Sequence, residues 1–393
     1  MKILMTSTFY PPYHIGGADT LVKYFAEQLV KEGHEVHVLF SLDAFKYKRP
    51  YQKKKENYNG VIVHAIESTL GIAEPILNYS LYTQQATMKA FKNLVLKEKF
   101  DLVHHHNISL LGYNILKKIG EYKNVYTAHD YWLVCPKFDL YKFGNICEKR
   151  TCLTCVPLHG KPYPIYQLFP DFKSTINNNL DLIIAPSDYM TGRLKRELKL
   201  PVKTIWNFVA EPPKKLIRPD ERNYFLFVGQ LEKHKGIVQL VDAFKGQNQR
   251  LIILGKGSLE QTLKRKLTEE GMSNVVYKGW ASSPSEVLGY MKYAKALILP
   301  SLWAENNPIV ALEAYSVGTP VIGTMNGGIP DIIKLLDEKL LFDSKDFSEL
   351  MQRIEFLERL KPNKNRIIKI FRDNFSFKAH KKKLKEAGYF DRV

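Results

Sequence analysis

Residues 2–40, KILMTSTFYPPYHIGGADTLVKYFAEQLVKEGHEVHVLF, contain the pattern that decides the fold. KILMT (2–6) is a short apolar run typical of a buried strand, and EVHVLF (35–40) is a second one. Between them DTLVKYFAEQLVK (19–31) has the spacing of an amphipathic helix, with Asp19 as its expected N-cap. A strand, a helix and a strand in this order predict a parallel βαβ unit.

The same alternation continues along the chain in two series. In the first series, further strands are expected at 61–66, 101–106, 124–129 and 181–186. In the second series, strands are expected at 224–229, 250–255, 274–279, 295–300 and 320–324, each followed by a helix-like segment. The sequence therefore predicts the α/β class, with two Rossmann-like, doubly wound domains that face a central cleft. Ligands of such sheets bind beyond the carboxyl ends of the strands.

A polar stretch separates the two series. VAEPPKKLIRPDER (209–222) has three prolines, seven charges and no apolar periodicity, so it is expected to be a linker. We expect a first domain over 1–208 and a second over 223–375. The basic segment 376–393 is expected to form a C-terminal helix that packs back on the first domain.

Composition limits the class of protein. The chain has 393 residues, of which 45% are hydrophobic and 25% charged, as in globular proteins. No apolar run approaches the ~20 residues that a membrane helix needs, so a cytoplasmic protein is expected. The formal net charge of +18 favours anionic partners without identifying them.

The most informative stretch for function is SLWAENNPIVALEAYSVGTPVIGTMNGGIPD (301–331). Glu305 lies in the turn after a strand, and Glu313 lies two turns into the helix that Pro308 is expected to begin. The N–H groups at the start of such a helix suit a phosphate, while the two carboxylates suit sugar hydroxyls. From spacing alone, two ordinary acids of a helix start and a surface remain the alternative.

The motifs of the whole chain resemble the GT-B glycosyltransferases, specifically the large retaining family 4. Glu305 and Glu313 match its E-x7-E signature, and FVGQLEKHKGIVQLVDAF (227–244) resembles its strand, phosphate-binding loop and helix. In the first half, FYPPYHIGGADT (9–20) resembles the glycine loop and TAHDYW (127–132) the histidine segment.

The resemblance implies roles for the donor side of the site. Glu305 would accept hydrogen bonds from hydroxyls of the donor sugar, and Glu313 would bind the ribose. Lys235 would neutralise the leaving diphosphate. Backbone N–H groups of the turn would hold that diphosphate, at Asn306, Asn307, Pro308 and Ile309.

The resemblance also implies roles for residues of the first domain, and the chain departs from the family pattern at one position. Gly16 and Gly17 would let backbone approach the phosphates with no side chain in the way. His129 would lie under the sugar. Gln230 stands where the family usually has arginine, so a second cation for the diphosphate is missing at that position.

The implied enzyme is a retaining, hexosyltransferase-type glycosyltransferase in surface polysaccharide synthesis. Its partners would be a nucleoside-diphosphate-sugar donor and a glycan or lipid-linked acceptor, with no nucleic acid. No Asp-x-Asp triplet offers the closely spaced acids that a divalent metal needs, so we expect metal-independent transfer without a cofactor.

All four cysteines lie in one segment, 135–155. Cys135, Cys147, Cys152 and Cys155 have the spacing C-x11-C-x4-C-x2-C, which predicts a structural zinc site in a cytoplasmic protein. Cysteines in a flexible lid, or a redox-labile pair, are the alternative.

Two other clusters leave alternatives open. The histidines 104–106 end a strand, and a metal site there is a minor alternative to structural roles. The run FKYKRPYQKKK (45–55) has six Lys and Arg residues and no acid. It predicts either a solvated loop or a patch for anionic lipid, which would make the protein peripheral on the inner face of a membrane.

Two other functions compete with the glycosyltransferase. A Rossmann oxidoreductase would use Asp43 for a ribose, but the chain has no G-x-G-x-x-G turn after its first strand. A metal-binding or RNA-binding α/β scaffold would explain the net charge and the cysteines, but not Glu305.

Overall fold

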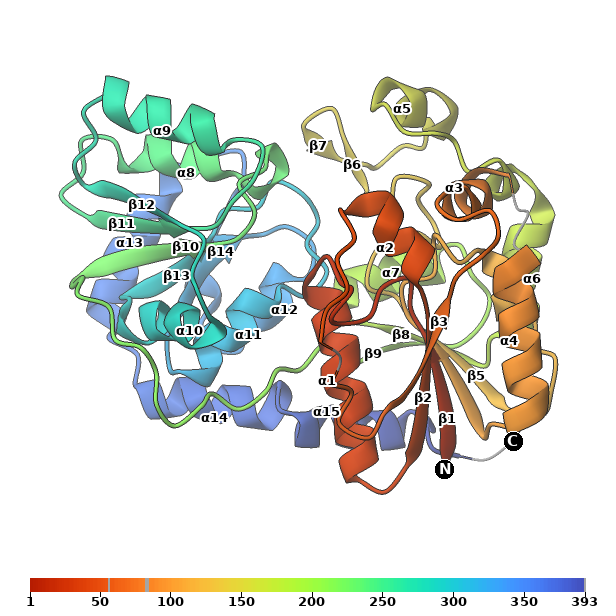
Figure 1. The fold of residues 1–393 in the computed structure, drawn as a ribbon. Coiled ribbons are helices and arrows are strands. Elements are labelled where there is room, and N and C mark those ends of the chain that lie inside the picture. Colours follow the sequence, from red (N-terminus) through yellow and green to blue (C-terminus); the bar gives the residue numbers. More distant parts are fainter. Residues whose placement is uncertain (56, 82–84, 392–393) are drawn as a thin grey trace. The chain divides into compact units, whose positions relative to one another are not determined.

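The computed structural model describes residues 1–55, 57–81 and 85–391 (Figure 1). These residues form two compact units, each built round its own parallel sheet. The expected strands are all present within one or two residues of their predicted bounds. Two Rossmann-like, doubly wound domains are thereby confirmed as the fold class.

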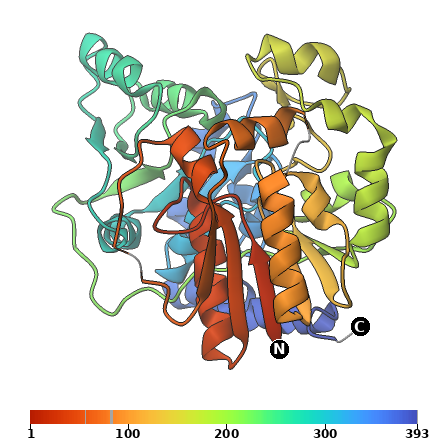
Figure 2. The same ribbon diagram turned by 45° about the vertical axis from the view of Figure 1, so that its right-hand side comes forward.

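The first unit contains a seven-stranded sheet in the order β3-β2-β1-β4-β5-β8-β9, and every neighbouring pair is parallel. Its strands are β1 (Lys2–Thr6), β2 (Glu35–Ser41), β3 (Ile62–Ile66), β4 (Leu102–His105), β5 (Lys123–Thr127), β8 (Leu182–Ala185) and β9 (Val202–Thr204). Its helices are α1 (Gly17–Lys31), α2 (Leu42–Lys48), α3 (Ala73–Ser80), α4 (Gln85–Glu98), α5 (Cys152–Leu158), α6 (Pro170–Asn179) and α7 (Asp188–Lys195). Short 3-10 helices are η1 (Tyr113–Leu116) and η2 (Ile165–Leu168). In Figures 1 and 2, α2, α3 and α5 lie beyond the end of the sheet at which β1 and β2 finish.

The second unit contains a six-stranded parallel sheet in the order β12-β11-β10-β13-β14-β15. Its strands are β10 (Tyr224–Val228), β11 (Arg250–Leu254), β12 (Val275–Gly279), β13 (Ala296–Leu299), β14 (Val321–Thr324) and β15 (Leu341–Phe342). Its helices are α8 (Ile237–Phe244), α9 (Glu260–Glu269), α10 (Pro284–Tyr293), α11 (Ile309–Ser316), α12 (Ile329–Ile333), α13 (Glu349–Leu360) and α14 (Lys364–Asn374), with the 3-10 helices η3 (Lys233–Lys235) and η4 (Glu338–Leu340). The central strands are apolar throughout because helices cover both faces of the sheet.

The division of the chain differs from the expected one in three places, of which the third is that residues 376–380 remain with the second unit. The boundary lies between Ile205 and Trp206, so the expected linker 209–222 belongs to the second unit. Residues 140–148, which carry the hairpin β6 (Tyr141–Lys142) and β7 (Asn145–Ile146), also group with the second unit. The expected cysteine-rich loop of the first domain is therefore divided between the units.

The last helix, α15 (Phe377–Glu386), passes from the second unit to the first, and the chain from Lys381 onward groups with the first unit. Tyr389 is fully buried there, and its hydroxyl lies 2.9 Å from His104 Nδ1.

The start of α1 corrects one prediction. The helix begins at Gly17, and its N-cap is Gly16, three residues before the expected cap Asp19. The Asp19 carboxylate instead accepts hydrogen bonds from the N–H groups of Ile15 and Gly16, at 3.0 and 3.1 Å. Asp19 thus caps the helix from its third position, as the acidic member of a capping box does.

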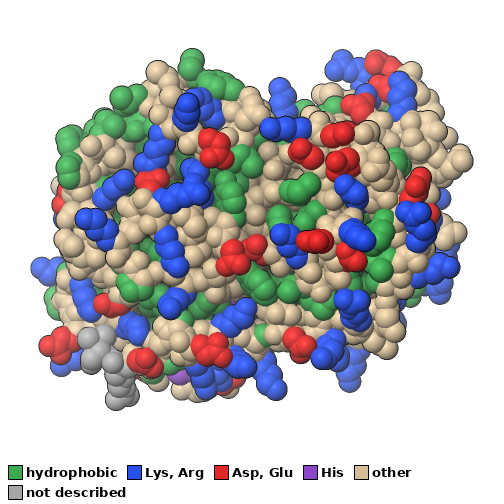
Figure 3. Space-filling model, turned by 180° about the vertical axis from the view of Figure 1, so that it is seen from behind, with side chains coloured by type: hydrophobic (Ala, Val, Ile, Leu, Met, Phe, Trp, Pro, Cys, Tyr) green, Lys and Arg blue, Asp and Glu red, His purple; other side chains and the backbone are tan. Residues whose placement is uncertain are grey.

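Within the described ranges, no helix combines the length and the apolar composition needed to cross a bilayer. Figure 3 shows one face of the molecule, on which Lys and Arg side chains are dispersed and acidic side chains lie among them.

Candidate active site

The direction in which strands are added to the second sheet reverses between β10 and β13, the kind of position at which doubly wound sheets bind ligands. Lys235 lies in η3 after β10, and Glu305 lies in the turn after β13. Lys235 Nζ donates a hydrogen bond to Glu305 Oε1 at 2.6 Å. The two residues expected to serve the leaving group and the donor sugar are therefore in direct contact.

Glu305 is a buried side chain whose surroundings stabilise the ionised carboxylate. Its side chain is buried, and the Ser301 hydroxyl donates to the same Oε1 at 2.7 Å. Burial alone would raise the pKa of Glu305, but the charge of Lys235 and the two hydrogen bonds hold that pKa below its ordinary value. Lys235 Nζ also lies 4.9 Å from the centre of the Trp303 ring. A paired carboxylate and ammonium are therefore present at neutral pH.

Two glycines let the backbone close round this pair. Gly327 has φ of +62°, and a Cβ atom there would lie 2.2 Å from the carbonyl oxygen of Glu305. Gly236, directly after Lys235, has φ of +71°, and its Cβ would lie 1.9 Å from the carbonyl oxygen of Pro300. Only glycine tolerates both the left-handed conformation and the close approach.

The helix after Glu305 starts one residue later than expected. Pro308 is the N-cap of α11, which begins at Ile309. Proline has no N–H group, so the backbone donors of this turn belong to Asn306, Asn307 and Ile309. The expected set of phosphate donors is corrected at Pro308 for this reason.

Asn307 contacts a residue that is distant in the sequence. Its side-chain oxygen accepts from the N–H group of Asn207 at 3.1 Å, and its carbonyl oxygen accepts from Asn207 Nδ2 at 3.4 Å. Asn207 is 100 residues away in the chain, and both residues are buried. Nothing in the local sequence signals this pair, which fixes the turn after Glu305 to the segment that opens the second unit.

Glu313 lies in the second turn of α11 and is partly buried. Burial raises its pKa to about 7. A carboxyl group in this state takes up or releases its proton near neutral pH, and its ionised form is ready to accept hydrogen bonds from hydroxyls.

Gln230 has an exposed side chain after β10. The next residue, Leu231, donates its N–H group to the carbonyl oxygen of Lys256 at 2.9 Å. The exposed Lys256 follows β11, the strand next to β10. A lysine is therefore available in the neighbouring segment, although Gln230 itself has no charge.

The first unit carries the glycines of the other expected phosphate contact. Gly16 and Gly17 begin α1, and a Cβ atom added at either position would meet no atom within 4 Å. Neither glycine is required by packing within this unit. The bare backbone there borders open space.

His129 follows β5 and is neutral at physiological pH. Burial lowers its pKa to about 4. Its Nε2 lies 2.9 Å from Nδ1 of His106, which follows the neighbouring strand β4. A neutral imidazole can hydrogen-bond a sugar hydroxyl without carrying charge.

The histidines of β4 have structural partners. His104 Nε2 lies 2.7 Å from the Thr127 hydroxyl, and His105 Nδ1 lies 2.8 Å from the Thr6 hydroxyl on the other side of the strand. Burial lowers the pKa of His105 to about 3. These contacts favour the structural interpretation of the three histidines over a metal site.

Two family models match consecutive parts of the chain. The model described as Glycosyltransferase Family 4 matches residues 15–211, and the model described as Glycosyl transferases group 1 matches residues 209–373. The chain belongs to glycosyltransferase family 4.

Relatives match this glycosyltransferase over much of its length. It is 26% identical over 357 residues to a Klebsiella pneumoniae protein described as an uncharacterized 42.6 kDa protein in the cps region, covering 86% of this chain and 88% of the relative. It is 28% identical over 272 residues, 64% of each chain, to the Escherichia coli UDP-Gal:alpha-D-GlcNAc-diphosphoundecaprenol alpha-1,3-galactosyltransferase.

Solved structures share the fold of the glycosyltransferase. Sucrose-phosphate synthase from Thermosynechococcus elongatus has a TM-score of 0.71 at 18% identity, over 99% of this chain and 98% of that one. Anabaena Alr3699/HepE in complex with UDP has a TM-score of 0.68 at 17% identity, over 99% of this chain and 100% of that one.

The cysteines of the glycosyltransferase are not joined by disulfide bonds in the part of the chain that the structure describes. Cys135 and Cys155 are buried, whereas Cys147 and Cys152 are partly exposed. Cys152 and Cys155 both lie on α5, and Cys155 Sγ is 3.7 Å from His159 Nδ1. Among the described residues the four cysteines are not a group whose ligand atoms lie within 4.8 Å of one another, so the structure does not bring the expected zinc ligands together.

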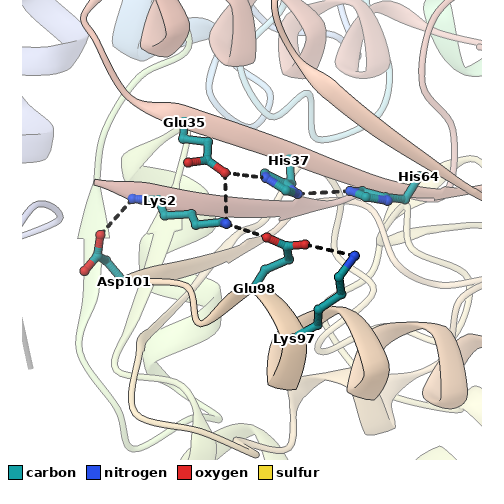
Figure 4. Close-up of polar contacts among 7 residues, drawn as sticks. All are labelled: Lys2, Glu35, His37, His64, Lys97, Glu98 and Asp101. Carbon is teal, nitrogen blue, oxygen red and sulfur yellow. Dashed lines mark hydrogen bonds and ion pairs between the residues drawn. The ribbon is translucent and has the colours of Figure 1, made fainter.

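Among the described residues, one group of three could hold a metal ion by the distances between its ligand atoms, which lie within 4.8 Å of one another. This group is Glu35, His37 and Glu98. Figure 4 shows Lys2 between the two carboxylates. Lys2 Nζ lies 2.9 Å from Glu35 Oε1 and 2.5 Å from Glu98 Oε2. The ammonium group already supplies the cation of this cluster. We interpret the cluster as an ion-pair network that joins β1, β2 and α4.

Asp43, the residue that an oxidoreductase would use, has a local role. It lies in α2, is buried, and accepts a hydrogen bond from the N–H group of Ser68 at 2.6 Å. The family assignment contradicts the oxidoreductase interpretation.

Proposed function

We propose that the chain is a retaining hexosyltransferase that moves a sugar from a nucleoside-diphosphate-sugar to a hydroxyl of a glycan or lipid-linked acceptor in surface polysaccharide synthesis. The contact between Lys235 and Glu305 supports this proposal most directly. It brings a cation and a buried carboxylate together at the switch point of the second sheet, beside the start of α11.

The chemistry assigns a different task to each group. The bond between the sugar and the diphosphate breaks, and the diphosphate leaves with the bonding electrons while the sugar gains oxocarbenium character. The acceptor hydroxyl oxygen forms the new bond to the anomeric carbon, and its proton goes to the departing diphosphate. Lys235 and the backbone donors before α11 stabilise the charge that develops on the diphosphate. Glu305 accepts hydrogen bonds from hydroxyls of the donor sugar, and Glu313 binds the ribose.

The same groups support the proposal of metal-independent transfer. Lys235 and the N-terminal end of α11 can supply the positive charge that a divalent ion supplies in other phosphate chemistry. We therefore propose that transfer needs no metal ion or cofactor.

The substrates are proposed from the relatives and neighbours. The Anabaena structure contains UDP, which supports a nucleotide donor, and the Escherichia coli relative is named for a diphosphoundecaprenol acceptor. The cps region of the Klebsiella relative agrees with a surface polysaccharide. We place the enzyme in the cytoplasm, at the inner face of the membrane where a lipid-linked acceptor would lie.

Two substitutions test the assignment of the catalytic site. Glu305→Gln and Lys235→Ala should each lower kcat by about 100-fold or more, because each removes a contact that strengthens as charge separates. Lys233→Ala is the matched control, since this exposed lysine lies in the same 3-10 helix as Lys235. Turnover of a labelled nucleotide-sugar at saturating substrate, with thermal unfolding as a check on folding, measures the effect.

Two results would contradict these assignments. Wild-type kcat in either site variant would show that the pair does not serve the reaction. A strict need for Mg²⁺ or Mn²⁺, restored after EDTA treatment, would contradict metal-independent transfer.

A further inference from the structure

The basic segment 45–55 is held against the body of the first unit. The Tyr51 ring stacks on Tyr13, with ring centres 5.7 Å apart. Lys54 Nζ donates to the carbonyl oxygen of Pro12 at 3.2 Å, and the Lys54 N–H group donates to the Tyr13 hydroxyl at 3.3 Å. The six Lys and Arg residues of this segment are therefore presented by an ordered backbone, which argues against a freely solvated loop.

Exposed apolar side chains lie beside these cations. Helix α2, whose second half belongs to the basic segment, packs against α3. The N–H group of Ser68, in the segment before α3, donates to the Asp43 carboxylate of α2 at 2.6 Å. On α3 and the turn before it, the side chains of Leu70, Ile72 and Ile76 are 54%, 53% and 37% exposed. We call the segments 45–55 and 67–81 together the α2–α3 surface.

The charge of the α2–α3 surface is mainly positive. Its acids are Glu67, which pairs with Lys46 at 2.8 Å, and Glu74, which is buried and accepts from the N–H groups of Ala86 and Thr87. The other cations have no acid in these segments to offset them. This differs from the face in Figure 3, where acidic and basic side chains are mixed.

We propose that the α2–α3 surface docks on an anionic lipid bilayer. Its Lys and Arg side chains would lie at the lipid phosphates, and Leu70, Ile72 and the exposed Tyr47 would enter the headgroup region. A soluble polyanion would use the cations but gain little from the apolar side chains, which is why lipid is favoured. The proposal rests on the membrane-linked acceptor proposed above and names the residues that contact the membrane.

The charge is tested by vesicle binding. Arg49→Glu, Lys53→Glu and Lys55→Glu together should weaken binding to vesicles of phosphatidylglycerol and phosphatidylcholine by about 100-fold at low salt. Lys54 is left unchanged because it contacts Pro12. Wild-type protein should bind vesicles of phosphatidylcholine alone only weakly.

A control variant separates location from net charge. Lys214→Glu, Lys215→Glu and Lys345→Glu make the same change in charge at exposed positions of the second unit, and this variant should keep most of the vesicle binding. An equal loss in both triple variants would mean that only the total charge of the protein matters, which would overturn the proposal.

The contribution of the exposed apolar side chains is tested with two matched double variants. Leu70→Gln with Ile72→Gln should weaken vesicle binding at 1 M salt, where charges are screened within ~3 Å. Leu153→Gln with Leu158→Gln changes two leucines of α5 that are 66% and 70% exposed, and this pair should have little effect. A greater loss of vesicle binding in the α5 variant would place the membrane contact elsewhere and overturn the proposal. Binding of the wild-type protein to heparin as tightly as to vesicles would also overturn it.

Nucleotide binding distinguishes this proposal from the proposed function. Thermal shifts with UDP, GDP and ADP, measured without vesicles, report the donor site alone. A nucleotide shift without vesicle binding would reject the docking surface and leave the glycosyltransferase site standing. Vesicle binding without a shift from any nucleotide or nucleotide-sugar would reject the proposed donor site and leave the surface standing.

Discussion

At the scale of single residues, Glu313 makes the donor site sensitive to pH. Burial raises its pKa to about 7, so the nucleotide-free protein carries a proton there below that pH. A ribose that needs the carboxylate must displace this proton. We expect nucleotide affinity, measured by calorimetry, to fall about tenfold for each pH unit below 7. The same slope in Glu313→Gln would contradict the assignment.

The same pKa predicts an effect on stability. A folded-state pKa above the ordinary value of ~4.3 means that folding favours the protonated form. Burying the ionised Glu313 carboxylate lowers the free energy of unfolding. This loss of stability develops as pH rises from about 4 to about 7 and is complete above 7. Glu313→Gln should therefore unfold at a higher temperature than wild type at pH 8, and the difference should vanish at pH 4.

At the scale of elements, the turn that holds Glu305 depends on Gly327. Gly327→Ala would add a Cβ atom 2.2 Å from the carbonyl oxygen of Glu305, at φ of +62°. Gly246 has φ of +70° with no atom within 4 Å of its Cβ position, so Gly246→Ala isolates the cost of the conformation alone. We expect a loss of roughly 1–2 kcal/mol for Gly246→Ala.

Gly327→Ala should cost at least about 3 kcal/mol, because the contact adds to the conformational term. It should also lower turnover, since the Glu305 turn must move. Urea unfolding and kcat of the two variants measure both effects. Equal stability of the two variants would mean that the turn yields without strain.

The cysteine segment gives a prediction at the same scale. Elemental analysis of protein purified without added metal should find about one zinc ion per chain, lost in Cys152→Ser and in Cys155→Ser. Thr154→Ser changes a neighbouring residue of α5 and should keep the metal. Metal-free protein with full activity and four titratable thiols would disprove the zinc site.

At the scale of the whole molecule, the chain returns for the last time from the second unit to the first at Lys381, and Tyr389 anchors this final segment in the first unit. Its ring is fully buried, and its hydroxyl meets His104. Tyr389→Ala should destabilise the first unit by about 3–5 kcal/mol, whereas Tyr389→Phe should cost only about 1 kcal/mol because it removes one hydrogen bond. Hydrogen exchange in β1 and β4 measures the loss, and unchanged protection in Tyr389→Ala would contradict this role.

The sequence by itself determined the elements, their order and the family motifs, because apolar periodicity and turn residues act over short distances. The tertiary structure decided which residues meet. Lys235 and Glu305 are 70 residues apart in the chain and touch because β10 and β13 are neighbours in the sheet, which no local pattern specifies. The contact of Asn207 with Asn307 could not be predicted for the same reason. Asp19 was predicted as the N-cap, but it lies at the third position of the helix, where its carboxylate can accept from the same N–H groups. The raised pKa of Glu313 also required the structure, since burial depends on everything packed around a side chain and not on its neighbours in the chain.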